Sequence, residues 1–381
     1  MSDTQKHTKP NVPNLRFPGF SGEWEQHLLS EYLEFKNGLN PSAKSFGEGI
    51  KFISVMDILN NPYITYDCIR ASVNASEKEK QEFNVEYGDI LFQRSSETLE
   101  DVGHANVYLD KKPALFGGFT IRGKKKGDYN PLFFKYLLDS PKARKKVIVK
   151  GAGAQHFNIG QEGLSSVSLY FPSKQEQKKI AELFELLDQR IAIQNKVIEK
   201  YESLIKALAY EIIGKHTPNI TLYECVRCTS STLKESDLAE AGTIPTYGAA
   251  GISGFTERAL AMGDSVLITK DGSGVGSLRY VSGPHSFVGT LNSMTPKDGV
   301  YLPYIYYALQ NVCFESYRTG QAIPHIYFKD YGKEAIYCPS FNDQKRLAKG
   351  LEMIDARIEI DRAALQALQS AKVYLLSAMF I

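Results

Sequence analysis

Ser173–Ile213 reads SKQEQKKIAELFELLDQRIAIQNKVIEKYESLIKALAYEII. Apolar residues recur in it every three or four positions, with Gln194 as the one polar interruption: Ile180, Phe184, Leu187, Ile191, Ile198, Tyr201, Ile205, Leu208 and Ile212. A repeat of about 3.5 residues keeps one seam of a helix facing a partner helix, so the pattern predicts a long coiled-coil helix. Ser173 and Glu176 form a capping-box pattern at its start, and Gly214 follows as a natural stop.

The pattern occurs a second time, beginning at Pro339-Ser340, at a constant offset in residue number. The second seam has the same length, and Asp361 stands where Gln194 interrupts the first: Leu347, Leu351, Ile354, Ile358, Asp361, Leu365, Leu368, Lys372, Leu375 and Met379. Identities at the same offset are Tyr170/Tyr337, Gln177/Gln344, Ala181/Ala348, Asp188/Asp355, Arg190/Arg357 and Ile191/Ile358. We expect the two helices to pack on each other in antiparallel fashion, with the polar positions fixing their register.

The repeat extends into the segments that precede the helices. Gly88-Asp89-Ile90-Leu91 corresponds to Gly263-Asp264-Ser265-Val266-Leu267, and Gly153-Ala154-Gln155-His156 is echoed by Gly320–His325. Short β-rich runs and two Pro-led helices are expected at Ile50–Val55, Asp89–Arg94, Ala105–Leu109, Ser265–Thr269, Leu278–Val281, Pro131–Leu138 and Pro303–Gln310. The chain is therefore predicted to be an internal duplication.

The predicted fold class is α+β, with two strand-rich mixed α/β domains, each followed by a long helix, and an approximate two-fold axis relating the copies. The expected boundaries are 1–172 for the first domain, 173–214 for the first helix, 215–339 for the second domain and 340–381 for the second helix. Leu15–Trp24 is expected to wrap onto the first domain.

Composition limits the class of protein. The 381 residues are 43% hydrophobic and 23% charged, values of a globular protein, and no apolar run reaches the roughly 18 residues of a membrane span. The polar start of the chain has no apolar core of a secretory signal. Five cysteines without framework spacing fit a reducing compartment, so we expect a cytoplasmic protein.

Charge is concentrated in one segment of the first domain. Lys111–Lys150 contains ten Lys and two Arg against two Asp, although the whole chain has a net charge of only +2. Such a cluster fits a binding surface for a polyanion, because clustered cations bind closely spaced phosphates. It also fits a solvated loop and helix face, and the sequence leaves both interpretations open.

Motifs for catalysis or metal binding are weak. Gly272–Gly276 lacks the Lys-Ser/Thr ending of a phosphate loop, and a hairpin loop is expected there. Cys225 and Cys228 have zinc spacing without a second ligand pair. Asn61-Pro62 and Asn130-Pro131 fall short of an amino-methyltransferase motif. No nuclease, helicase or nucleophilic-triad pattern is recognisable, so the residues favour a binding protein over an enzyme.

At this point the chain resembles a known family, the specificity subunits of type I restriction–modification enzymes. The resemblance spans essentially the whole length. It rests on Leu15-Arg16-Phe17-Pro18-Gly19-Phe20 with Trp24, on Tyr170-Phe171-Pro172 and Tyr337-Cys338-Pro339, on Ile244–Gly248 with Gly254-Phe255, and on Lys270–Gly274.

The resemblance implies that each globular unit is a target-recognition domain reading one half of a bipartite double-stranded DNA site. It implies that the helices set the spacing of the half-sites and dock two modification (methyltransferase) subunits. S-adenosylmethionine, ATP and Mg are then expected on the modification subunits and the ATP-driven restriction subunits, with no cofactor or metal in this chain. The alternative is a coiled-coil scaffold that binds only proteins, which explains the helices but neither the basic segment nor the duplicated domains.

Candidate DNA contacts are polar or cationic side chains, since Lys and Arg bind phosphates and Arg, Gln, Asn, Ser and Tyr read base edges. In the first domain they are Lys44, Arg94, Ser95, Lys124, Lys125, Gln155 and His156, and in the second Tyr247, Lys270, Ser273, Arg279, Arg318, Gln321 and His325.

Overall fold

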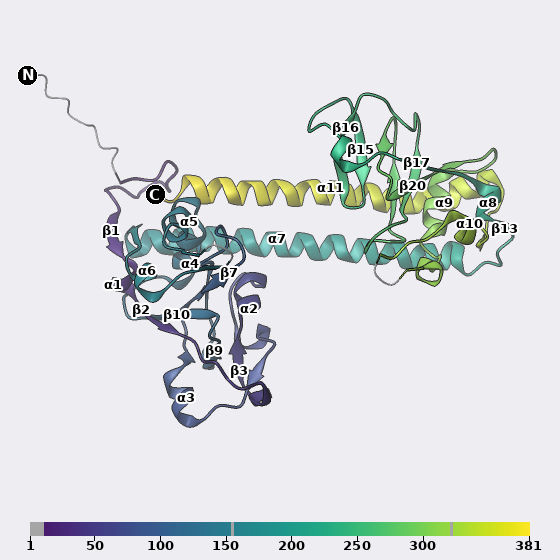
Figure 1. The fold of residues 1–381 in the computed structure, drawn as a ribbon. Helices are drawn as coiled ribbons and strands as arrows, with labels where there is room; N and C mark the ends of the chain where they lie inside the picture. Colours follow the sequence, from purple (N-terminus) through teal and green to yellow (C-terminus); the bar gives the residue numbers. More distant parts are fainter. Residues whose placement is uncertain (1–10, 154–155, 321–322) are drawn as a thin grey trace, which may run out of the picture. The chain divides into compact units, whose positions relative to one another are not determined.

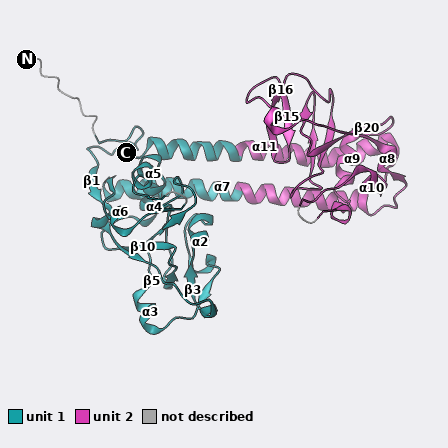
Figure 2. Ribbon diagram, in the orientation of Figure 1, with its two compact units in different colours: residues 1–193, 365–381 teal, residues 194–364 magenta. Residues whose placement is uncertain are grey.

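The computed structural model describes residues 11–153, 156–320 and 323–381 (Figure 1). The chain divides into two compact units, each containing one strand-rich domain and a part of both long helices (Figure 2). Unit 1 comprises residues 1–193 and 365–381, and unit 2 comprises residues 194–364. Among the described residues, no helix combines the length and the apolar character needed to cross a membrane.

The first domain contains short strands and helices that belong to unit 1. Its strands are β1 (Glu25–Leu28), β2 (Leu33–Asn37), β3 (Phe46–Ile53), β4 (Ser72–Val73), β5 (Asn84–Val85), β6 (Ile90–Gln93), β7 (Ser95–Ser96), β8 (Ala105–Val107), β9 (Ala114–Phe116), β10 (Thr120–Lys125), β11 (Phe157–Asn158) and β12 (Ser168–Phe171). Its helices are α1 (Leu29–Tyr32), α2 (Val55–Asn60), α3 (Glu77–Glu82), α4 (Pro131–Asp139), α5 (Pro141–Ile148) and α6 (Gln161–Ser165).

The second domain belongs to unit 2 and is smaller. Its strands are β13 (Ile220–Thr221), β14 (Val226–Ser230), β15 (Ile244–Gly248), β16 (Gly251–Thr256), β17 (Ser265–Thr269), β18 (Leu278–Val281), β19 (Ser286–Phe287), β20 (Leu291–Pro296) and β21 (Ala335–Ile336). Its helices are α8 (Leu222–Cys225), α9 (Leu302–Leu309) and α10 (Phe328–Tyr331). The long helices are α7 (Lys174–Ala209), which continues as a π-helical turn to Gly214, and α11 (Phe341–Ala378).

The two domains share one sheet topology, which confirms the predicted duplication. The central antiparallel sheet has the strand order β2-β10-β6-β8 in unit 1 and β14-β20-β17-β18 in unit 2. A second sheet in each domain contains a parallel pair, β3 with β9 and β15 with β19. The expected strands at Ser265–Thr269 and Leu278–Val281 have the predicted bounds, and they flank the Gly272–Gly276 loop as an antiparallel hairpin.

The register corrects one predicted correspondence. Ala152 and Asn158 exchange both backbone hydrogen bonds, at 2.9 and 2.8 Å, and Thr319 and His325 do the same at 2.9 Å. His325 therefore corresponds to Asn158 and not to His156, so the predicted echo between the two histidines is wrong. The sequence comparison matched the two histidines because they are the same residue type. The backbone pairing matches positions instead, and the two loops have the same length but different sequences.

The helix seam follows the predicted pattern. Every predicted seam position on α7 and α11 is buried or partly buried. Within unit 2, Gln194 Nε2 donates to Asp361 Oδ1 at 2.9 Å, so the polar interruptions pair with each other. Within unit 1, Asp188 in the first half of α7 pairs with Lys372 near the end of α11 at 2.5 Å. The two helices therefore pack antiparallel, with the polar pair at one position of the seam.

Identical residues at the constant offset bind each domain to its own helix. Gln177 Oε1 accepts from the backbone N–H of Asn130 at 3.0 Å, and Gln344 Oε1 accepts from that of Tyr301 at 2.8 Å. Both glutamines also donate to the carbonyl of the proline that precedes the helix, at 3.0 and 2.9 Å. Each glutamine is buried, and its amide oxygen and nitrogen both have hydrogen-bond partners, so these bonds fix the junction between domain and helix.

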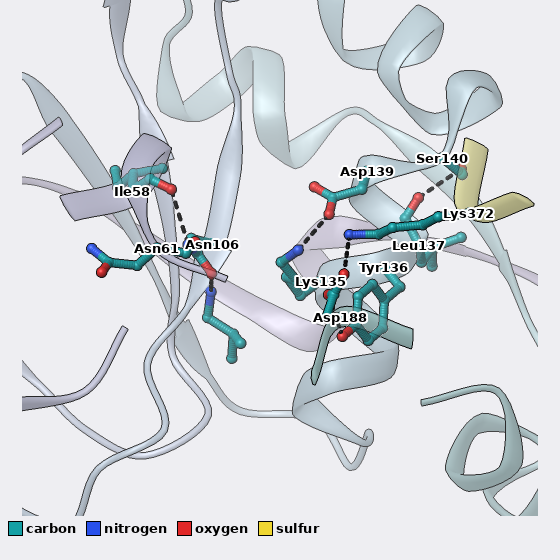
Figure 3. A network of polar contacts seen from close by, with 11 residues as sticks. Ile58, Asn61, Asn106, Lys135, Tyr136, Leu137, Asp139, Ser140, Asp188 and Lys372 are labelled. Carbon is teal, nitrogen blue, oxygen red and sulfur yellow. Dashed lines mark hydrogen bonds and ion pairs between the residues drawn. The ribbon is translucent and has the colours of Figure 1, made fainter. Parts of the chain in front are cut away.

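Tyrosine–aspartate pairs make a second junction in each unit. Tyr136 on α4 donates to Asp188 at 2.9 Å, and Tyr307 on α9 donates to Asp355 at 2.5 Å. Figure 3 shows Tyr136 and Lys372 converging on Asp188, with the pair of Lys135 and Asp139 beside them. The aspartates retained at the constant offset are therefore acceptors that hold α4 or α9 against a long helix.

The segment that precedes the first domain packs into unit 1, as predicted. Trp24 is 2% exposed and lies edge-on to Phe133 and Phe380. Glu176, which is 1% exposed, accepts from Arg16 Nε and Nη2, both at 2.7 Å. One half of the predicted capping box is present, because the Glu176 backbone N–H donates to Ser173 Oγ at 3.4 Å. The other half is wrong, because the Glu176 carboxylate accepts from Arg16 and does not reach back to the start of the helix.

Candidate nucleic-acid interface

Arg94 lies directly after β6, where backbone hydrogen bonds fix its position. Its N–H donates to the carbonyl of Phe119 at 2.9 Å, and its own carbonyl accepts from Ile159 at 3.0 Å. The guanidinium Nη1 donates to the carbonyl of Gly118 at 3.4 Å. Arg94 therefore lies beside the turn between β9 and β10 that carries Phe119.

Lys270 occupies the same position in unit 2. It lies directly after β17, its N–H donates to the carbonyl of Thr290 at 2.9 Å, and its carbonyl accepts from Ile326 at 2.9 Å. The sequence singled out Arg94 and Lys270 separately, and the structure shows that they are equivalent. Because main-chain groups hold both positions, the side chains there can differ without changing the framework.

Ser95, the next candidate along the chain, lies close to His156. β7 pairs antiparallel with β11, with Ser95 opposite Asn158, and Ser95 Oγ donates to Asn158 Oδ1 at 2.5 Å. His156 precedes this strand, is exposed, and accepts from Asn158 Nδ2 through its carbonyl at 3.3 Å. The pair of strands therefore brings Arg94, Ser95 and His156 together, whereas Gln155 lies outside the described residues.

Lys44 is exposed on a short 3₁₀ turn, Ala43–Ser45, beside an apolar groove. The groove has a volume of about 420 Å³ and is lined by Leu39, Asn40, Pro41, Phe46, Phe52, Ser54, Val55, Met56, Gly117, Gly118, Phe119 and Thr120. Gly118, one of the lining residues, also accepts the hydrogen bond from Arg94. Phe119 is 70% exposed at the groove's rim.

Lys124 and Lys125 lie on β10 and are not among the residues that line the groove. Lys124 pairs with Glu86 at 3.7 Å. Lys125 Nζ donates to the carbonyl of Tyr129 at 3.3 Å and lies 4.9 Å from the centre of its ring. Burial lowers the pKa of Lys125 below its usual value. Both candidates therefore have protein partners, and Lys125 is the less available for a phosphate.

The rest of the dense basic segment is also engaged with main-chain acceptors. Lys142 donates to the carbonyl of Phe380 at 2.9 Å, and Lys146 donates to that of Ser168 at 2.9 Å. Arg144 donates to the carbonyls of Glu100 and Val102 at 2.7 and 2.8 Å. These cations hold α5 against the rest of unit 1, so part of the segment serves packing.

Tyr247 and Arg279 form a second group in unit 2. The Arg279 guanidinium carbon lies 5.9 Å from the centre of the Tyr247 ring, a cation–π geometry. Gly251, with a φ of +142°, begins β16 beside them, and a Cβ there would lie 3.8 Å from Arg279 Nη1. The hairpin β15–β16 and strand β18 therefore present one aromatic and one exposed cationic side chain together.

The remaining candidates of the second domain lie on two loops that touch. The backbone N–H of Gly272 donates to the carbonyl of Pro324 at 2.9 Å, which joins the loop of exposed Ser273 to the loop of His325. Arg318 pairs with Glu315 at 2.8 Å, so its charge has a protein partner. Gln321 lies outside the described residues.

Three neighbours of these candidates were not among the residues chosen from the sequence: Phe119 and Asn158 in unit 1, and Thr290 in unit 2. The signal for Phe119 was the Gly117-Gly118 pair before it, which marks a tight turn that exposes its next residue. The signal for Asn158 was the constant offset, which aligns it with His325.

The weak catalytic and metal motifs have structural roles. Asn130 caps α4, because its Oδ1 accepts from the backbone N–H of Phe133 at 2.9 Å. Cys225 is buried against Cys338, and contact with that thiol raises the pKa of Cys225. Within residues 11–153, 156–320 and 323–381, no group of three or more His, Cys, Asp or Glu side chains is arranged to hold a metal ion.

Comparison with known families shows where this duplicated arrangement occurs. The model of the type I restriction modification DNA specificity domain matches residues 21–203 and again residues 225–370. The chain belongs to this family of specificity subunits. The two matched segments coincide with the two copies of the fold, so each recognition domain of this specificity subunit is matched with a large part of a long helix.

Individual relatives are distant. The chain is 25% identical over 217 residues to a protein described as the type I restriction enzyme MjaX specificity subunit of Methanocaldococcus jannaschii, covering 55% of this chain and 50% of that one. It is 24% identical over 182 residues to the type I restriction enzyme EcoKI specificity subunit of Escherichia coli K12, covering 46% and 39%. The matches therefore span half or less of these curated relatives.

Solved structures share the fold over nearly the whole chain. The S subunit of a type I restriction–modification system from M. genitalium aligns with a TM-score of 0.63 and 20% identity, covering 97% of this chain and 99% of that one. A chain from a structure on assembly and conformational transition of the type I R-M system aligns with a TM-score of 0.54 and 15% identity, covering 93% and 96%.

Proposed function

We propose that this specificity subunit reads a bipartite double-stranded DNA site, with one half-site for each domain, within a type I restriction–modification complex. The observation that carries the proposal is the duplicated framework, in which equal backbone positions hold different polar side chains, Arg94 in one domain and Lys270 in the other. Two copies of one reader with different side chains suit a target whose two halves differ in sequence.

The candidate residues divide into two roles in this proposal. Exposed Lys44 would bind phosphate, since phosphate contacts supply affinity without reading sequence. Arg94, Lys270 and Ser273 lie on loops that follow central strands, Ser95 begins the short strand β7, and all four would read base edges. Arg318 and Lys124, whose charges are paired with Glu315 and Glu86, would contribute less.

The chain is proposed to be the non-catalytic member of the complex and to act in the cytoplasm. Modification subunits would carry S-adenosylmethionine, and restriction subunits would carry ATP and Mg. Docking of two modification subunits is supported by apolar side chains that α7 and α11 leave exposed, among them Leu186, Ile193, Met353 and Ile360.

The alternative is a scaffold that binds only proteins. Mapping of methylated sites in a host genome, with and without the chain, separates the two. We expect a set of methylated bipartite sites that disappears with the chain and returns when it is restored. A methylation pattern indifferent to the chain would refute DNA readout and leave the scaffold.

The helices are proposed to set the length of the unread spacer between the half-sites. A test inserts seven residues, one heptad, into both helices where they pass between the units, after Ile193 in α7 and after Ala364 in α11. One heptad preserves the seam and adds about 10 Å of helix, or about three base pairs. We expect a spacer longer by about three base pairs with both half-sites retained. An unchanged spacer would show that the helices hold partners without measuring DNA.

A further inference from the structure

We infer that residues 94 and 119 in the first domain, and residues 270 and 290 in the second, are matched base-contacting positions that set which bases each half-site contains. The inference rests on the proposed DNA readout and names the side chains that make it specific. Phe119 and Thr290 add a reading position that the polar candidates did not include.

The first step is the equivalence of the two pairs. Thr120 lies opposite Gln93 in the central sheet of unit 1, and Leu291 lies opposite Thr269 in that of unit 2. The residue after Gln93 or Thr269 then donates its N–H to the carbonyl of the residue before Thr120 or Leu291, at 2.9 Å in both domains. Positions 94 and 119 are therefore hydrogen-bonded neighbours, as are 270 and 290.

The second step is that the framework imposes no side chain at these positions. The bonds that hold them are backbone to backbone, and Phe119 and Thr290 are both exposed. An aromatic side chain that is 70% exposed contributes little to the core, so its presence needs a reason outside folding. The equivalent residue is threonine, so the fold does not require an aromatic ring at this turn.

The third step is the chemistry around Phe119. It lies at the rim of the apolar groove of about 420 Å³, with the Arg94 guanidinium bonded to the adjoining Gly118. Exposed Lys44 lies beside the same groove. Apolar walls with an exposed phenyl ring fit the edge of a base pair in duplex DNA where the thymine methyl group is presented, and a neighbouring guanidinium fits a base-edge acceptor.

The side chains then indicate different readings in the two halves. Arg94 can donate two parallel hydrogen bonds to guanine O6 and N7, and Phe119 can contact the thymine methyl group. Lys270 offers donors from a single nitrogen, and Thr290 offers a hydroxyl and one methyl group. The first half-site is therefore expected to contain a guanine next to a thymine that depends on these residues.

The experiment exchanges the pairs between the domains. R94K/F119T gives the first domain the second domain's side chains, and K270R/T290F does the reverse. Tyr87→Thr is the matched control, because Tyr87 is an exposed aromatic residue of unit 1 outside the groove. Each variant is expressed with the complete set of partner subunits, and its methylated sites are mapped.

We expect R94K/F119T to change the base preference at one or two positions of one half-site by roughly five- to a hundredfold, the range of one good base contact. K270R/T290F should change only the other half-site, and Tyr87→Thr neither. Unchanged preferences in both swaps, with methylation still dependent on the chain, overturn the inference. Methylation that never depended on the chain refutes the proposed function instead.

Two further measurements test whether a variant has lost its fold and whether the groove binds a protein instead of DNA. Fluorescence of Trp24, the single tryptophan, reports whether unit 1 remains folded in R94K/F119T. The single variant Phe119→Thr is the fallback, since it changes only an exposed side chain. If Phe119→Thr abolishes methylation at every site with no change in preference, the groove binds a partner protein and the inference fails.

Discussion

The pair of partly exposed Arg16 and buried Glu176 should contribute strongly to the stability of unit 1. The carboxylate accepts two hydrogen bonds of 2.7 Å from one guanidinium, and the same guanidinium donates to the carbonyls of Gly22 and Ser21 at 2.6 and 3.2 Å. Glu176→Ala would leave the Arg16 charge, whose side chain is only 14% exposed, without its counter-ion.

The expected cost follows from that geometry. Removing one partner of a buried pair costs about 3–5 kcal/mol, because the remaining charge is desolvated and uncompensated. For a unit of this size each kcal/mol lowers the unfolding midpoint by roughly 2–4 °C, so a fall of about 6–20 °C is expected. Arg16→Ala should cost a similar amount, and the double variant should cost less than the sum of the two.

The assay uses the fluorescence of Trp24, which is buried in unit 1 and therefore reports the unfolding of that unit. Arg190→Ala, an exposed change on the same helix, is the control and should stay within about 0.5 kcal/mol of the parent. If Glu176→Ala shifts the midpoint no further than this control, or if the two single effects simply add, the pair does not stabilise the unit in the way argued.

Three further outcomes are expected. The hydrogen bond from His27 to Glu31 raises the pKa of His27 above 6.5. The stabilisation from this bond is therefore present below pH 6.5 and is lost as the pH rises through the raised pKa. His27→Gln should lower the unfolding midpoint, followed by tryptophan fluorescence, more at about pH 6 than at about pH 8. Lys44→Ala should reduce the slope of log K against log salt by about one in DNA-binding titrations, whereas Lys142→Ala, whose amine is bonded internally, should leave the slope unchanged. Tyr136→Phe should destabilise unit 1 by about 1.5–3 kcal/mol in urea titrations, since it removes a hydrogen bond to a carboxylate on α7.

The helices and the duplication could be predicted because both are recorded locally in the sequence. A seam period depends only on neighbouring turns, and the constant offset made each half a comparison for the other. That comparison picked out Gln177/Gln344 and Asp188/Asp355 without revealing their roles. The structure shows that they are the hydrogen bonds between domain and helix.

The site was predicted less completely, for physical reasons. Counting charges in Lys111–Lys150 could not show that Lys142 and Lys146 end on main-chain carbonyls far along the chain. The capping pattern at Glu176 could not reveal a competing arginine from the start of the chain. Phe119 was overlooked because the search was for polar side chains, and an exposed aromatic residue is recognised only once burial is known.

The claim that each domain reads one half of the target is tested most directly by replacing one domain. Residues 215–338 are exchanged for the equivalent segment of a relative with a known different target, and the methylated sites are mapped. The account predicts that one half-site changes to that of the relative, while the other half-site is retained. A target in which both halves change, or in which neither changes, would contradict it.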